Sequence, residues 1–137
     1  MGKYFDSTKK VIKTIDTDLV SAALSTVVFS IVKKYPEYGD QLAATFKYLA
    51  SLVSDETLTE EEFHKEIEKA ISDIGVKNPE MRELIGFFLR KLDTLADKYL
   101  DVESGFTSEE REAWRKVFEE LADAAKLARR TSKKEEK

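Results

Sequence analysis

Apolar residues recur in this chain at intervals of three and four positions, and this spacing restricts the fold to helices. The clearest case is residues 19–32, where the apolar stripe is so wide that the predicted helix is buried on most sides. The β-branched pairs Val27–Val28 and Ile31–Val32 would also suit a strand, but the length of the segment favours a helix. Only two prolines and five glycines interrupt the chain, so long helices are expected throughout.

Proline, glycine and capping residues mark where the first three main helices begin and end. Pro36 pushes Tyr35 out of the helical region and so ends the helix over residues 19–32. Asp40 opens a second helix. Residues 59–62 (Thr-Glu-Glu-Glu) form a capping box that starts a third helix, and Gly75 is its predicted C-terminal cap.

The second half of the chain carries start signals for two more helices. Asn78 followed by Pro79 is typical of a helix start, with proline at the first helical position. Gly105 is expected to end that helix, and residues 107–110 (Thr-Ser-Glu-Glu) begin the last one. The sequence thus predicts an all-α fold of about five main helices, with a further short helix near residues 4–14.

The length and the distribution of apolar residues indicate one domain. A chain of 137 residues is long enough to bury a single sizeable core. We expect residues 1–128 to form this domain. Residues 129–137 contain no apolar side chain, so they are predicted to be a charged, disordered tail.

Composition excludes several classes of function. The net charge of −4 argues against binding to nucleic acid, which requires a basic face. The absence of cysteine excludes disulfides and thiolate metal sites. The apolar stretch over residues 19–32 is interrupted by serine and threonine and is shorter than a bilayer span, so membrane insertion is not expected. Without a secretion signal, a soluble, cytoplasmic protein is predicted.

Four segments of the chain resemble helices of the globin family. Residues 18–38 (DLVSAALSTVVFSIVKKYPEY) are similar to the second globin helix and the proline-marked corner that follows it. Residues 41–53 (QLAATFKYLASLV) are similar to the long helix on the distal side of the haem. Residues 75–89 (GVKNPEMRELIGFFL) and 105–125 (GFTSEEREAWRKVFEELADAA) resemble the last two helices, which pair with one another in that family. The resemblance implies a globin-like bundle with a shortened corner before the distal helix.

The resemblance also implies where a haem ligand should be, and no ligand is found there. In globins a histidine near the end of the helix before the penultimate one binds the iron. The matching positions here are Ala70, Ile71 and Ile74, which cannot supply the axial donor that haem iron requires. The single histidine, His64, lies about two turns earlier among charged residues, and is the alternative haem ligand. A haem-free domain is therefore predicted.

The place that a haem would occupy is surrounded by a mostly apolar set of residues. With the distal position on Gln41, the resemblance places here Gln41, Leu42, Thr45, Phe46, Leu49, Ile67, Ile71, Phe88 and Leu92. These residues could line a cavity for an acyl chain, with Gln41, Lys47 and Tyr48 as polar anchors for its carboxylate. They could also fill the space themselves, which the large side chains favour.

The function predicted from these features is a haem-free binding or regulatory module for a small hydrophobic ligand such as a fatty acid. One alternative is a haem protein, for oxygen binding or peroxidase chemistry, that uses His64 as an atypical ligand. Another is a purely structural or engineered helical domain with a filled core. No phosphate loop, serine–histidine–acid arrangement or buried carboxylate pair is recognised, so an enzyme is not expected. A homodimer or another protein partner is compatible with the sequence, and no metal site is predicted.

Overall fold

The computed structural model describes residues 15–100 and 106–135, and every regular element in these ranges is a helix. The elements are α2 (Thr17–Lys34), the short 3-10 helix η1 (Pro36–Tyr38), α3 (Gly39–Leu52), α4 (Glu60–Ile74), α5 (Pro79–Tyr99) and α6 (Ser108–Glu135). The all-α prediction is therefore confirmed. The short helix expected near residues 4–14 and the helix break expected at Gly105 lie outside the described residues.

The ends of α4 and α5 follow the capping signals of the sequence. The Thr59 hydroxyl accepts a hydrogen bond from the Glu62 backbone N–H at 3.1 Å, and the Glu62 carboxylate accepts one from the Thr59 N–H at 3.0 Å. At the start of α5 the Asn78 side chain accepts hydrogen bonds from the N–H groups of Glu80 and Met81 at 3.0 and 3.1 Å. These bonds satisfy backbone donors that a helix start leaves unpaired.

Gly75 forms the tight turn between α4 and α5. It is the C-cap of α4, as predicted, and its φ of −97° is accessible to any residue. What requires glycine is space, because a Cβ at this position would lie 3.0 Å from the backbone N and Cα of Arg82. The missing side chain therefore allows the turn to bring the two helices together.

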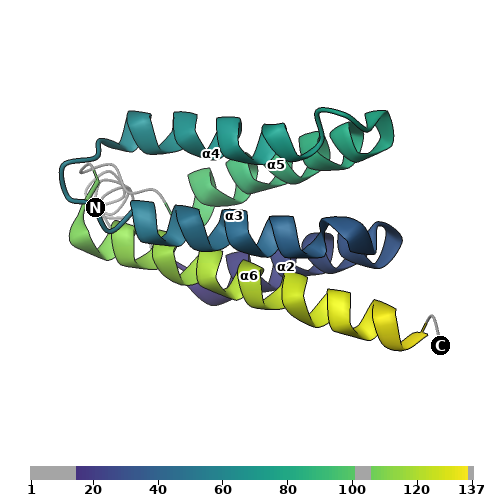
Figure 1. The fold of residues 1–137 in the computed structure, drawn as a ribbon. Coiled ribbons are helices and arrows are strands. Elements are labelled where there is room, and N and C mark those ends of the chain that lie inside the picture. The colour runs from purple at the N-terminus through teal and green to yellow at the C-terminus, as the bar shows by residue number, and fades with distance from the viewer. Residues whose placement is uncertain (1–14, 101–105, 136–137) are drawn as a thin grey trace, which may run out of the picture.

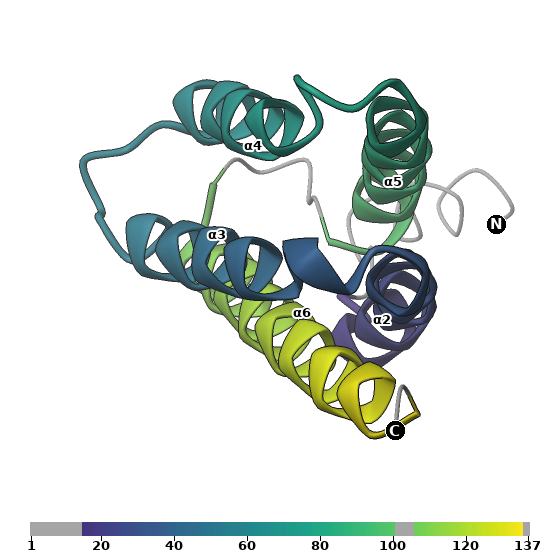
Figure 2. The same cartoon turned by 45° about the vertical axis from the view of Figure 1, so that its right-hand side comes forward.

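The helices form two layers, which are visible in both ribbon views (Figures 1 and 2). One layer consists of α4 and α5, which cross one another, as Figure 2 shows. The other consists of α2, α3 and α6, and the backbone of α6 lies closest to α3 and α2. The core lies between and within these layers.

The pairing of the last two helices differs from the prediction drawn from the globin resemblance. The closest backbone neighbours of α5 are α2 and α4, whereas those of α6 are α3 and α2. Side-chain size explains the arrangement. The second half of α6 presents Ala122, Ala125 and Ala128, all fully buried, which allow neighbouring helices to approach closely. Its first half presents the large Trp114 and Phe118 instead.

Aromatic rings fill the space between the two layers. The Phe46 ring of α3 lies 5.6 Å from the ring of Phe88 on α5 and 6.0 Å from that of Phe118 on α6. The Phe63 ring of α4 meets the Trp114 ring edge-on at 5.4 Å. All five side chains are at most 1% exposed. These offset and edge-to-face contacts join the layers through side chains where the backbones are far apart.

Arg111, near the start of α6, fixes the loop that leads into α4. Its guanidinium group donates hydrogen bonds to four backbone carbonyls of this loop, those of Val53, Asp55, Glu56 and Leu58, at 3.3, 2.7, 3.3 and 2.7 Å. It also lies 4.3 Å from the centre of the Phe106 ring. The planar, five-donor group of arginine suits such a set of acceptors. Arg111 thereby sets the position of α4.

The last helix, α6, extends past residue 128, where a charged tail is predicted from the sequence, and ends at Glu135. Ala128 and Ser132, one turn apart, are both buried. The Arg129 stem packs on Gly39, where a Cβ would lie only 2.9 Å from the Arg129 Cβ, and its Nη2 atom is 3.6 Å from the Asp40 carboxylate. Small residues and an arginine stem therefore continue the packed face without any large apolar side chain.

Candidate functional site

A cleft of about 220 Å³ lies between α4 and α5, away from the turn that joins them. Its lining consists of His64, Ile67, Glu68, Leu89, Leu92, Asp93 and Trp114. Three of these residues come from α4, three from α5 and one from α6. The cleft is therefore an opening at the edge of the aromatic layer.

Helical spacing explains how the two walls are built. On α4, Ile67 follows His64 by three positions, and on α5 Leu92 follows Leu89 by three, so each pair projects from one face of its helix. Ile67 and Leu92 are each 3% exposed, while His64 and Leu89 are half-buried. The walls are thus apolar inside and become polar toward solvent.

Trp114 forms the base of the cleft and is held in place by its neighbours. Its ring stacks on Phe118 at 5.7 Å and meets the His64 imidazole edge-on at 5.5 Å, with the two planes 82° apart. The side chain is fully buried. The Trp114 Nε1–H has no hydrogen-bond acceptor within the described part of the chain. A buried donor without an acceptor is destabilising, and a ligand atom could satisfy it.

Carboxylates dominate the rim of the cleft. Glu68 and Asp93 lie on opposite walls and are exposed. The His64 Nε2 atom lies 3.7 Å from the Glu60 carboxylate, one turn earlier on α4. The rim therefore carries more negative than positive charge, above an apolar base.

A second, more open depression of about 610 Å³ adjoins the cleft. It is lined by His64, Asp93, Thr94, Ala96, Asp97 and Lys98. His64 and Asp93 belong to both cavities. Its lining is mainly polar and comes largely from one helix, unlike the mostly apolar lining that is usual for a small-molecule site.

The structure brings three of the sequence-predicted residues together in the cleft, namely His64, Ile67 and Leu92. Five others are buried in the core at most 1% exposed: Leu42, Phe46, Leu49, Ile71 and Phe88. Thr45 is half-buried and Gln41 is exposed. Aromatic rings occupy the space around Phe46. The cleft opens at the edge of this aromatic layer.

The three polar anchors considered for a carboxylate headgroup, Gln41, Lys47 and Tyr48, are all exposed on α3. The Tyr48 hydroxyl donates a hydrogen bond to Glu66 at 3.0 Å, which links α3 to α4 and raises the pKa of the Tyr48 phenol. None of the three lines the cleft.

The residues present do not fit a haem held as in globins. Ile71, at a position that matches the iron ligand, is fully buried and has no donor atom. The adjacent interlayer space holds Phe46 and Phe88. Within the described ranges, no group of three or more histidine, cysteine, aspartate or glutamate side chains could hold a metal ion. No chemistry through a metal is derived for this site.

Four cleft residues, Glu68, Leu89, Asp93 and Trp114, were not predicted to be part of a site. The single tryptophan of the chain, Trp114, carries an indole N–H that needs an acceptor when it is buried, and this is the signal in the sequence that could have found it. Leu89 lies three positions before Leu92, and this spacing alone would place both on one wall.

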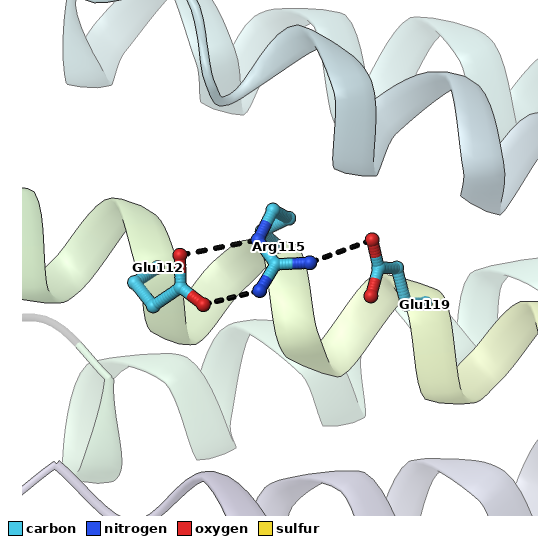
Figure 3. A network of polar contacts seen from close by, with 3 residues as sticks. All are labelled: Glu112, Arg115 and Glu119. Carbon is cyan, nitrogen blue, oxygen red and sulfur yellow. Dashed lines mark hydrogen bonds and ion pairs between the residues drawn. The ribbon is translucent and has the colours of Figure 1, made fainter.

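An ion-pair network lies on α6, outside the cleft, as Figure 3 shows. The Arg115 guanidinium binds Glu112 with two nitrogen atoms and Glu119 with a third, the last at 2.6 Å. Hydrogen bonds from Arg115 lower the pKa of Glu112. The three residues belong to successive turns of one helix and are solvent-accessible, so they stabilise the helix surface modestly.

Comparisons with protein-family models, curated proteins and solved structures found no match to this chain. In the described part of the chain, no helix combines the length and the apolar character needed to cross a bilayer. The cleft between α4 and α5 is the feature of the described residues on which a proposal about function rests.

Proposed function

We propose that this chain is a haem-free binding module that takes up a small hydrophobic ligand in the cleft between α4 and α5. The observation that carries the proposal is the combination of an apolar opening with a buried, unpaired donor. Ile67, Leu89 and Leu92 offer apolar walls and Trp114 lies at the base. The Trp114 Nε1–H is buried and lacks an acceptor among the described residues. Apolar cavities with a few polar groups are the usual form of small-molecule sites.

The size and charge of the cleft indicate the kind of ligand. A volume of about 220 Å³ suits a short alkyl or single-ring compound. The rim carboxylates Glu68 and Asp93 would repel a fatty-acid carboxylate, so a neutral or cationic headgroup is favoured over the fatty acid suggested by the sequence. A hydroxyl or carbonyl oxygen could accept the Trp114 hydrogen bond.

Trp114 is the only tryptophan, so its fluorescence reports directly on the cleft. We expect a saturable change in emission on titration with hexanol and with hexylamine, and a weaker response to hexanoate. Binding also raises the melting temperature, because the ligand stabilises the folded state. Equal binding of hexanoate and hexylamine would contradict the role given to the rim charges.

A matched pair of variants tests the site. Leu89→Phe places a larger side chain in the cleft and should weaken hexanol binding by about tenfold or more. Leu84→Phe, also at a half-buried leucine of α5 but outside the cleft, should bind as the wild type does. If both variants bind hexanol as tightly as the wild type, the ligand does not occupy this cleft.

A purely structural domain is the second candidate, and the filled aromatic centre favours it. The contacts of Phe46 with Phe88 and Phe118 leave the middle of the layer occupied by side chains. This alternative predicts that neither the emission of Trp114 nor the melting temperature changes in a saturable way with any of the three compounds.

A further inference from the structure

The outer face of α5 combines a protruding aromatic ring with a hollow. Phe87 is 46% exposed although it is a large apolar residue. The depression beside it measures about 540 Å³ and is lined by Arg82, Glu83, Leu84, Gly86, Phe87 and Arg90. If two copies of the chain pair through this face of α5, the Phe87 ring of each copy can enter the depression of the other.

Gly86 has no evident purpose within the chain itself. A Cβ at this position would meet only the Arg90 Nη1 atom, at 3.4 Å, which is an ordinary contact with the end of a flexible side chain. Glycine inside a helix is less stable than alanine, so the position carries a cost that no close contact explains. A close approach by another molecule would explain it.

We propose that two copies of this chain associate through antiparallel α5 helices, with the two-fold axis passing between Gly86 and Phe87. Such an axis places Phe87 against Gly86 of the partner subunit, and Gly86 against the partner's Phe87. The same operation aligns residues that are equally far from the axis on opposite sides, as an isologous interface requires.

One pair of opposite charges on this face, Glu83 and Arg90, agrees with that operation. Glu83 and Arg90 lie equally far from the axis, so Glu83 of one subunit faces the partner's Arg90, and the reverse pair forms as well. Both residues are exposed, and neither has an ion-pair partner in the described part of the chain. Opposite charges placed in this way fix the orientation of the two helices. The Glu83–Arg90 pairs therefore favour a second copy of the chain as the molecule that covers this face.

Sedimentation velocity across a concentration series tests the proposal. The full chain should sediment as a dimer that dissociates on dilution, and Phe87→Glu should weaken association by about tenfold or more. Gly86→Ala should also weaken the dimer, yet raise the melting temperature measured at a concentration where the chain is monomeric. A wild-type chain that stays monomeric up to about 1 mM would overturn the proposal.

Charge exchange distinguishes this geometry from any other dimer. Glu83→Arg and Arg90→Glu should each weaken self-association because like charges then face one another across the axis. Mixing these two variants should restore dimers that native mass spectrometry identifies as mixed pairs, since both facing positions again have opposite charge. Failure to form mixed dimers, with both single variants still self-associating as the wild type does, would place the interface elsewhere.

Discussion

The contact of Arg111 with the loop before α4 predicts a large loss of stability on Arg111→Ala. One side chain donates to four carbonyls between Val53 and Leu58 and lies over the Phe106 ring. The backbone hydrogen bonds of the loop itself join residues at most four positions apart. Arg111 is thus the main connection between this loop and α6.

The geometry sets the size of the expected effect. The two bonds of 2.7 Å, to Asp55 and Leu58, come from a charged donor, and such bonds contribute about 1.5 kcal/mol or more each. The two bonds of 3.3 Å add less, and the cation–π contact adds about 0.5 kcal/mol at a partly exposed site. In the Arg111→Ala variant, water replaces part of these hydrogen bonds. We therefore expect the free energy of unfolding to fall by about 3 kcal/mol.

Urea unfolding followed by circular dichroism measures this loss. Arg111→Lys should lose nearly as much as Arg111→Ala, because an ammonium group keeps the charge but cannot reach four carbonyls. Arg115→Ala, one turn further along α6, is the control, and its loss should be much smaller because its partners are exposed. A change below about 0.5 kcal/mol in Arg111→Ala would refute the role given to this residue.

Three further predictions concern the hydrogen bonds and the core. The Tyr35 phenol donates to Glu80 at 2.5 Å, and this bond raises the pKa of Tyr35 from 10.0 to about 12. Its stabilising effect is complete below pH 10 and is lost as the pH rises through 12. Tyrosinate absorbance should show a late-titrating component that Tyr35→Phe reduces, and a titration curve left unchanged by Tyr35→Phe would contradict this. Phe46→Ala should cost about 3–5 kcal/mol in thermal or urea unfolding, because it removes a ring that contacts two helices; a loss under about 1 kcal/mol would mean that the core is loosely packed. Ile71→His should destabilise the fold without creating a Soret band on addition of hemin, because the imidazole enters a filled core; a new Soret band would support the globin register instead.

Local signals allowed the helices to be predicted from the sequence. The capping box at Thr59 and the Asn78–Pro79 start depend on residues within one turn of each other, so they can be recognised without the tertiary structure. The same is true of the apolar stripe of α2, whose buried residues include Val20, Leu24 and Val28.

Contacts between distant segments could not be predicted in this way. Arg111 binds carbonyls more than fifty positions away, and nothing in its own neighbourhood indicates them. Composition alone predicts a tail from residue 129 onward, whereas the packing of the Arg129 stem depends on the distant Gly39. Three of the cleft residues, His64, Ile67 and Leu92, were among those predicted from the sequence. Its base at Trp114 depends on how α6 packs, which helical periodicity does not determine.

The most direct test of ligand binding in the cleft is a proton–nitrogen NMR spectrum recorded during titration with hexanol. The single indole N–H signal, from Trp114, should shift as this donor gains an acceptor. Backbone signals of residues 64–68 and 89–93 should shift with it, at the same midpoint. An indole signal that stays fixed at saturating hexanol, or shifts confined to other helices, would contradict the account.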